Sequence, residues 1–250
     1  MNTNFRVLIP AGGRGLRSGL NYPKTLYKID NIPILIRLCR VLKEYDKNPL
    51  IIINPSNKIQ FEKALMEFKI EAELVYQNEP RGMGHAVLQA DDRLKENNQV
   101  ILVWSDIPFL NPFTIENLIN CHNLFENDFS MATSKCEECY TIVERSHGKL
   151  LRVIETRAEK IPPGKNGERD IGLFIFNKES VFSLLRADIK KSISKKNKEY
   201  GFLHIIEKLI ASGKKAEAYP IAHSSDLLSF NTPEDLKQIE NSFGLTTRDK

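Results

Sequence analysis

The chain has 250 residues, of which 41% are hydrophobic and 27% are charged, and its formal net charge at pH 7 is +4. This composition suffices for one domain with a sizeable core and argues against a disordered or fibrous protein. No apolar run approaches the roughly 20 residues that span a membrane, and the first residues lack the basic and apolar regions of a signal peptide. We therefore expect a single domain over residues 1–250, in a cytoplasmic protein with no membrane partner.

Two local features could suggest nucleic-acid binding or a zinc site, but the sequence around each of them argues against that function. Many of the positive charges lie between Arg186 and Lys198. No aromatic residues are interleaved with these lysines to stack on bases, so a solvated helix face or loop explains them better than a nucleic-acid site. Cys136 and Cys139 have the CxxC spacing of a zinc site, but no second pair of ligands follows. We expect reduced thiols there.

The first half of the chain alternates between predicted strands and helices. Short apolar runs predict strands over residues 6–10, 50–53, 73–76 and 99–104, and apolar residues at helical spacing predict helices over 34–45, 59–68 and 84–94. The second half is less regular, with a strand over 172–176, a helix over 203–212 and a last helix opening at residues 232–235. Apolar strands separated by helices indicate an α/β fold, namely a Rossmann-like, mostly parallel mixed sheet with helices on both faces.

A glycine-rich segment, AGGRGLR, follows the first predicted strand. Ligands bind such sheets at the carboxyl ends of the strands, and glycines there let backbone N–H groups approach phosphates. Arg17 in this segment and Lys24 shortly after it could neutralise phosphate charge. A glycine-rich loop alone is equally well a simple turn, so the basic pair is what favours a phosphate site.

Two other nucleotide-binding patterns fit this segment poorly. A dinucleotide-binding GxGxxG pattern fails because Ser18 stands in place of the last glycine, and the second predicted strand ends at Asn54 rather than at an acidic residue. A P-loop is excluded because no Gly-Lys-Ser/Thr sequence follows.

Asp106 follows the most apolar predicted strand. An isolated Asp after a strand is more often a turn residue. Here three strand-end segments are expected to converge on one cleft, and a carboxylate in such a cleft is a natural ligand for Mg²⁺ beside phosphates. This convergence favours the metal-ligand interpretation.

Taken in order, these motifs resemble those of the sugar-phosphate nucleotidylyltransferases, most closely the uridylyltransferase part of N-acetylglucosamine-1-phosphate uridylyltransferase. The resemblance covers nearly the whole chain. One such motif alone would be weak evidence for the family, whereas the full set of motifs in the same order is strong evidence. It implies the nucleotide-diphospho-sugar transferase type of fold. The segments that carry it are residues 11–17, 23–24, 77–86, 106–108, 140, 155, 168–172, 199–200 and 231.

The resemblance also implies a role for each matching residue. Arg17 and Lys24 would be catalytic, contacting the triphosphate, while Asp106 and Asn231 would hold Mg²⁺ as the cofactor. The residues that would bind the nucleotide are Ala11, Gly12, Gly13, Gln77 and Gly82. Those that would face the acceptor phosphate are Thr141, Glu155 and Asp170. The implied partners are a nucleoside triphosphate, with UTP or CTP favoured, and a small phosphorylated substrate, while a homo-oligomer stays open.

The chain departs from the family pattern at four positions. Leu16 stands where the family usually has Thr or Ser, and Ser105 replaces a glycine. Thr141 replaces a glycine and Asp170 an asparagine, both on the acceptor side. An Asn side chain both donates and accepts hydrogen bonds, whereas an ionised Asp only accepts them. We therefore expect an acceptor other than N-acetylglucosamine-1-phosphate, one that carries an amine or additional hydrogen-bond donors.

Several alternatives remain at this point. The main rival is a cytidylyl- or guanylyltransferase for a non-sugar phosphate or a different sugar phosphate, and Gln77 favours a pyrimidine without separating uracil from cytosine. A catalytically silent nucleotide-binding regulatory protein is disfavoured because Lys24, Asp106 and Asn231 are all present. We expect His85 to pack at a helix start near the nucleotide rather than to act in catalysis.

Overall fold

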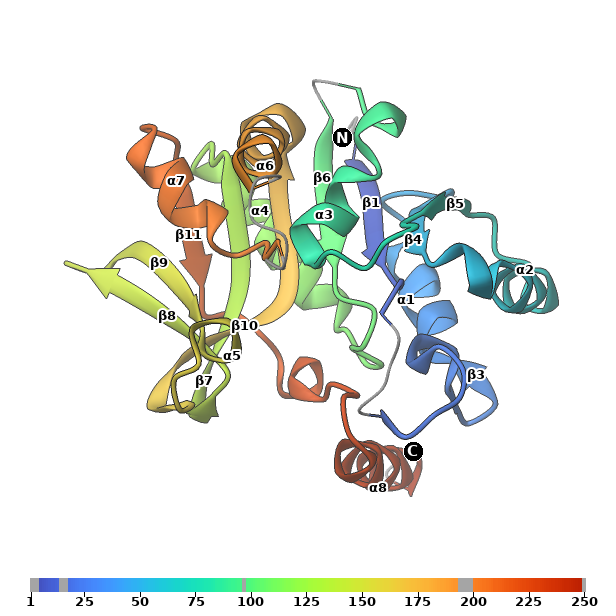
Figure 1. Cartoon of the computed structure of the whole chain (residues 1–250). Coiled ribbons are helices and arrows are strands. Elements are labelled where there is room, and N and C mark those ends of the chain that lie inside the picture. Colours follow the sequence, from blue (N-terminus) through green and yellow to red (C-terminus); the bar gives the residue numbers. More distant parts are fainter. Residues whose placement is uncertain (1–4, 14–17, 96–97, 193–199, 249–250) are drawn as a thin grey trace.

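A seven-stranded sheet forms the centre of the fold (Figure 1), which the computed structural model describes over residues 5–13, 18–95, 98–192 and 200–248. The strand order is β11-β7-β10-β6-β1-β4-β5. Only β10 runs antiparallel to its neighbours, and the other adjacent pairs are parallel. The predicted mostly parallel mixed sheet is therefore confirmed. Its strands are β1 (Phe5–Pro10), β4 (Leu50–Ile53), β5 (Glu73–Tyr76), β6 (Gln99–Val103), β7 (Phe129–Cys139), β10 (Gly164–Asn177) and β11 (Ala216–Tyr219).

Helices cover both faces of the sheet because its central strands are apolar on both sides. In β4, Ile51 and Ile53 belong to one buried cluster and Leu50 and Ile52 to the other, as the two-residue side-chain period of a strand requires. The first cluster contains residues of α1 (Ile34–Leu42), α2 (Lys58–Glu67) and α4 (Pro112–Leu124). The second contains residues of α3 (Met83–Leu88), α6 (Lys178–Ser192) and α7 (Ile205–Ala211).

The predicted elements of the first half are present, although two helices are shorter than expected. Helix α1 ends at Leu42, and α3 ends at Leu88 before a separate 3₁₀ turn, η4 (Asp91–Arg93). The structure also contains elements that we did not predict, among them α4, β7, β11, β8 (Thr141–Ser146) and β9 (Lys149–Glu155). Strands β8 and β9 pair as a separate two-stranded sheet beside the main one (Figure 1). Among the residues described, no helix is both long and apolar enough to cross a bilayer.

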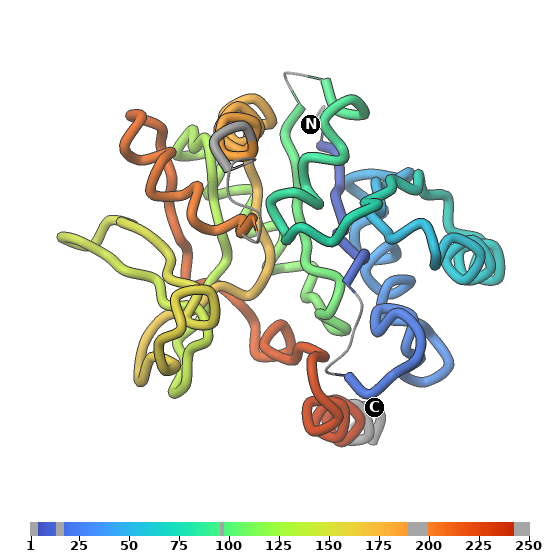
Figure 2. The backbone as a smooth tube through the Cα atoms, in the orientation of Figure 1, coloured from blue at the N-terminus to red at the C-terminus, as the bar shows by residue number. Residues whose placement is uncertain are grey.

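The last helix, α8 (Pro233–Arg248), returns to the first part of the chain. It begins where predicted, since the backbone N–H of Asp235 donates to Thr232 Oγ1 at 3.2 Å. Figure 2 shows it beside the segment that follows β1, which includes η2 (Lys24–Leu26) and the short strands β2 (Lys28–Ile29) and β3 (Ile32–Pro33). Tyr27 Oη donates to Glu240 Oε1 at 2.7 Å, and Ile239 is buried in the first cluster. The C-terminal helix thus covers the segment that carries Lys24.

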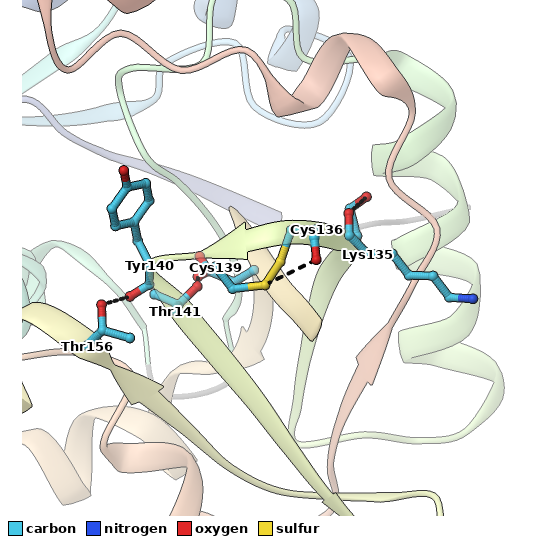
Figure 3. The surroundings of a disulfide bond; sticks show 8 residues. Lys135, Cys136, Cys139, Tyr140, Thr141 and Thr156 are labelled. Carbon is cyan, nitrogen blue, oxygen red and sulfur yellow. Dashed lines mark hydrogen bonds between the residues drawn. A yellow bond between two sulfur atoms is a disulfide. The ribbon is translucent and has the colours of Figure 1, made fainter. Parts of the chain in front are cut away.

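Cys136 and Cys139 are joined by a disulfide bond (Figure 3). The expectation of reduced thiols is therefore wrong for this pair, whose Cα atoms lie 5.8 Å apart, within the range that a disulfide spans. The pair lies at the end of β7, and Tyr140 and Thr141 follow it directly. Cys39 and Cys121 are free thiols.

A bulge in β10 brings the backbone close to the aromatic core. The register between β10 and β7 shifts between Asp170 and Phe174, and Gly172 within this stretch has φ +80°. A Cβ atom on Gly172 would lie 2.4 Å from Cδ1 of Trp104. The Trp104 ring packs on Phe174, with centroids 4.9 Å apart. Bulges re-aim side chains beside functional sites, and this one carries Asp170.

We expect Gly172→Ala to destabilise the protein more than Gly148→Ala does. Gly148 has φ +79°, and a Cβ atom on it would meet no atom within 4 Å beyond its chain neighbours, so its replacement isolates the backbone cost of roughly 1–2 kcal/mol. Replacing Gly172 adds the collision with Trp104, which we expect to cost roughly 1–3 kcal/mol more. Urea unfolding of both variants measures the difference, and equal losses would contradict the close packing.

Candidate active site

Three segments that are distant in the sequence meet at the side chain of Lys24. Its Nζ donates to Asp106 Oδ2 at 2.9 Å, to Asn231 Oδ1 at 2.9 Å and to the carbonyl oxygen of Phe230 at 2.7 Å. The structure therefore brings together the Lys24, Asp106 and Asn231 that we singled out in the sequence. The Phe230 carbonyl was not predicted, because no side-chain pattern identifies a backbone group.

The sheet and the last helix hold these groups in place. Asp106 lies just beyond the carboxyl end of β6, and its carbonyl oxygen accepts from the N–H of Phe230 at 2.9 Å. The backbone N–H groups of Asn231 and Thr232 both donate to Asp235 Oδ2 at 2.8 Å. Together with the Thr232 cap, this is the reciprocal pattern of a capping box. Sequence reasoning missed Asp235, although Thr-x-x-Asp before an apolar run was a usable signal.

A cleft of about 410 Å³ opens beside the glycine-rich segment. Its lining residues are Gly12, Gly13, Asn21, Tyr22, Pro23, Asn54, Ser56 and Asn57. A Cβ atom on Gly12 would lie 3.3 Å from Gln77 Oε1, so glycine lets this segment pack closely against Gln77. Ala11 anchors the segment, since its N–H donates to the carbonyl of Ile52 at 2.7 Å. Arg17, which we predicted to be catalytic, lies outside the described residues.

Gln77 lies buried at the end of β5 and is held by the segment that starts α3. Its Nε2 donates to the carbonyl of Gly82 at 3.2 Å and to His85 Nδ1 at 3.0 Å. Burial is the main cause that lowers the pKa of His85, so the ring is neutral at pH 7 and can accept this hydrogen bond. Gly82 has φ +98°, and a Cβ atom there would lie 2.6 Å from the carbonyl oxygen of Tyr200. These contacts fix the Gln77 amide in one orientation.

Thr141, Glu155 and Asp170 lie together on the other side of the site. Thr141 at the start of β8 is the register partner of Glu155 at the end of β9. Thr141 Oγ1 donates to Asp170 Oδ1 at 2.5 Å, and the N–H of Gly172 donates to Asp170 Oδ2 at 3.0 Å. A Cβ atom on Gly201 would lie 3.0 Å from Glu155 Oε1. The loop before α7 therefore lies close against the Glu155 carboxylate.

Burial dominates the electrostatics of Asp170, which is only 7% exposed. Desolvation raises the pKa of its carboxyl group, the hydrogen bonds from Thr141 and Gly172 oppose that rise, and the negative charge of Asp106 adds to it. Asp170 therefore lies close enough to Asp106 to feel its charge, which connects the two halves of the site.

The oxygen atoms around Lys24 suit a hard divalent cation. They comprise one carboxylate, one side-chain amide and one backbone carbonyl. Within the described ranges, no three His, Cys, Asp or Glu side chains gather into a metal site. Mg²⁺ fits such a sparse set, because it commonly uses one or two carboxylates and takes its remaining ligands from water and substrate phosphates.

This fold and the clustered site define the class of nucleotidyltransferases, and the comparisons with known proteins agree. The sequence model of the MobA-like NTP transferase domain matches residues 7–189, and the chain belongs to that family. The family-level prediction from the ordered motifs is thereby confirmed. Phe230, Asn231 and Asp235 lie beyond the matched stretch.

Individual relatives resemble nearly the whole chain. The bifunctional protein GlmU of Thermodesulfovibrio yellowstonii is 30% identical over 239 residues, covering 92% of this chain and 50% of that protein. The inositol-1-phosphate CTP transferase of T. maritima has a similar fold, with a TM-score of 0.74, 16% identity and coverage of 96% of this chain and 95% of its own. UDP-glucose pyrophosphorylase in complex with UDP-glucose has a TM-score of 0.72, 16% identity and coverage of 96% and 98%. The chain spans about half the length of the curated relatives it matches.

We expect Asp170→Asn to stabilise the protein at neutral pH. The raised pKa of Asp170 means that the folded state binds its proton more tightly than the unfolded state, so wild-type stability falls as pH rises from the ordinary carboxyl pKa through the raised one. An amide has no charge to bury, and we expect the variant to have a Tm roughly 2–4 °C higher at pH 7, the change that about 1 kcal/mol makes in a chain of this size.

Thermal unfolding of both proteins at pH 7 and pH 4 measures this difference. The advantage of Asn should shrink toward pH 4, because the raised pKa favours protonation of the wild-type carboxyl group as pH falls. A difference in Tm that does not change with pH would contradict the role assigned to the buried charge.

Proposed function

We propose that this protein transfers a nucleotidyl group from a nucleoside triphosphate, with UTP or CTP favoured, to a sugar-1-phosphate or similar small phosphate, and releases pyrophosphate. The observation that carries this proposal is the convergence of Lys24 with Asp106 and Asn231 at the carboxyl edge of the sheet. The glycine-lined cleft continues from this cluster through Pro23, the neighbour of Lys24. Such a site suits a triphosphate, because its ammonium group can neutralise phosphate charge, its oxygens can hold a metal ion and its glycine backbone lets phosphates approach closely.

The proposed chemistry is an in-line attack by the acceptor's phosphate oxygen on the α-phosphorus of the triphosphate. The new P–O bond forms as the bond to the β-phosphate oxygen breaks, and pyrophosphate leaves with that electron pair. The attacking phosphate is already an anion, so the site needs no general base. Lys24 would neutralise negative charge on the triphosphate, and positioning with charge neutralisation would supply the rate enhancement. Arg17 would assist Lys24 in neutralising this charge.

The remaining residues would position the two substrates. The backbone at Ala11, Gly12 and Gly13 would accommodate the phosphates, and the fixed amide of Gln77 with the Gly82 backbone would pair with the edge of a pyrimidine. Asp106 and Asn231 would hold Mg²⁺. When bound, this ion would neutralise charge on the phosphate oxygens.

The names of the similar proteins support this class of reaction. They include an inositol-1-phosphate CTP transferase and a UDP-glucose pyrophosphorylase, both acting with pyrimidine nucleotides by those names. Guanylyl transfer stays behind uridylyl and cytidylyl transfer because the Gln77 amide favours a pyrimidine. A cytoplasmic location remains a prediction, as does a homo-oligomer.

The acceptor side supports a substrate with hydrogen-bond donors. Thr141 donates its only hydroxyl proton to Asp170, so its oxygen lone pairs are what it can offer to a ligand. The carboxylate of Glu155, the register partner of Thr141, is likewise an acceptor. We propose that the second substrate presents a hydroxyl or ammonium group here, and that it differs from N-acetylglucosamine-1-phosphate.

A matrix of four nucleoside triphosphates against small phosphates, measured by pyrophosphate release, tests the proposed function. We expect turnover with UTP or CTP, loss of that turnover in EDTA and its recovery with added Mg²⁺. A preference for N-acetylglucosamine-1-phosphate over phosphates bearing amines or additional hydroxyl groups would contradict the acceptor proposal. Tight nucleotide binding without turnover for any acceptor would instead favour a catalytically silent regulatory protein.

We expect Asp106→Ala to lower kcat by at least about 100-fold at saturating Mg²⁺, because it removes the charged oxygen ligand of the proposed ion. Asp92→Ala is a suitable control, since Asp92 is an exposed carboxylate outside this cluster. Steady-state pyrophosphate release measures both variants, and thermal unfolding checks that they fold. Near-normal turnover of Asp106→Ala would refute the metal assignment.

A further inference from the structure

The ammonium group of Lys24 is surrounded by three oxygen atoms, as a bound cation would be. A lysine ammonium has three N–H donors, and those of Lys24 are directed at three oxygens, on Asp106, Asn231 and Phe230, at 2.7–2.9 Å. The side chains of Lys24 and Asp106 are 20% and 18% exposed. Solvent therefore screens this ion pair less than it screens pairs on the open surface.

The same three oxygens are the ligands that the chain offers to a divalent cation. Two cations cannot be centred among one set of oxygens, and their like charges repel strongly at such short range. A divalent ion can use these oxygens only after Lys24 has left them. The free protein is thus arranged to exclude a divalent ion that arrives alone.

The backbone that carries these oxygens is held by contacts that do not involve Lys24. Asp235 accepts from the backbone N–H of Asn231, the N–H of Phe230 donates to the carbonyl of Asp106, and the buried ring of Phe230 packs edge-on against Tyr27 with centroids 5.4 Å apart. Lys24, in contrast, carries its charge on a flexible four-carbon stem. The Lys24 side chain can therefore leave the cluster while the backbone that carries the three oxygens stays in place.

We propose that Lys24 is an exchangeable internal counter-ion, which holds the three oxygens in the free protein and leaves them for the anionic phosphates when a nucleoside triphosphate binds. This inference rests on the proposed function, because a triphosphate is the anion that competes for Lys24. Divalent-ion binding and nucleotide binding are coupled through this one side chain. A bare ion binds weakly, and an ion that arrives with nucleotide binds tightly.

Binding of Mn²⁺, measured by the electron paramagnetic resonance signal of the free ion, tests the exchange without any turnover. Mn²⁺ prefers the same oxygen ligands as Mg²⁺. In the absence of nucleotide we expect Lys24→Met to bind Mn²⁺ at least about tenfold more tightly than the wild type, because the competing charge is gone while the apolar stem remains. Lys24→Arg, which keeps a charge at this position, should stay close to the wild type.

Lys28→Met is the matched control for net charge. Lys28 lies four residues further along the chain and pairs with Glu67 at 2.9 Å on the open surface, so its loss removes one positive charge without touching the three oxygens. Adding Asp106→Asn to Lys24→Met should abolish the gain in affinity. A non-hydrolysable triphosphate should tighten Mn²⁺ binding more in the wild type than in Lys24→Met.

The exchange is overturned if Lys24→Met binds Mn²⁺ no more tightly than Lys28→Met, or if the gain survives Asp106→Asn. Thermal unfolding shows whether each variant folds, and the wild-type comparison with and without nucleotide tests the coupling independently of any variant. Equal tightening by nucleotide in the wild type and in Lys24→Met would also refute it. Pyrophosphate release by the wild type is measured separately, so failure of the proposed function is distinguishable from failure of the exchange.

Discussion

Parallel pairing of β1 with β4 on one side and β6 on the other is the constraint on which the rest of the structure depends. It buries strands that are apolar on both faces, which is why helices must cover both sides. It also brings the carboxyl ends of these strands to one edge of the sheet. The glycine-rich segment after β1 and Asp106 after β6 are neighbours at this edge for that reason, although more than 80 residues separate Lys24 from Asp106.

The C-terminal part of the chain adds further groups to the site at this edge of the sheet. Asn231 reaches the site because the capping box at Thr232 and Asp235 fixes the backbone where α8 starts. The same segment is tied to the loop after β6 by the hydrogen bond from Phe230 to Asp106. The residues that open the last helix are therefore also part of the site. The oxygens that the two segments contribute are close enough together for a single ammonium group to satisfy them.

The regular parts of this fold could be predicted because their signal is local. Leu50 to Ile53 is apolar at every position, as a strand buried on both faces requires, and Thr232-Pro233 marks a helix start by chemistry that involves only neighbouring residues. Strand β7 gives no such signal. Its buried positions include Ser130 and Thr133, whose polar groups are satisfied by the side chains of His122, eight residues earlier than Ser130, and Glu168, 35 residues later than Thr133. The β8–β9 ribbon, which pairs as a separate two-stranded sheet, was also not predicted.

Some features of the candidate site could likewise be predicted from the sequence, whereas others depend on contacts between distant segments. Asp106 could be selected because it follows an identifiable strand, and Lys24 because it lies close in the sequence to Arg17 and the glycine-rich segment. Asn231 was selected only through the resemblance to a known family, which placed all three in one cleft. The disulfide between Cys136 and Cys139 could not be predicted in the same way. Its formation depends on the path of β7 beside β10, and the CxxC spacing alone suits free thiols, a metal or a disulfide.

Asp170 shows how burial and recognition constrain each other on the acceptor side. Its carboxyl group lies where desolvation opposes the charge, and both oxygens are occupied by Thr141 and Gly172. An asparagine could fill the same space without that electrostatic cost, so the acid gains nothing for stability. What it supplies is a fixed direction for the Thr141 hydroxyl, since a carboxylate can only accept. The threonine oxygen then faces its other neighbours as an acceptor, and an acid at this position therefore suits the acceptor site that we propose.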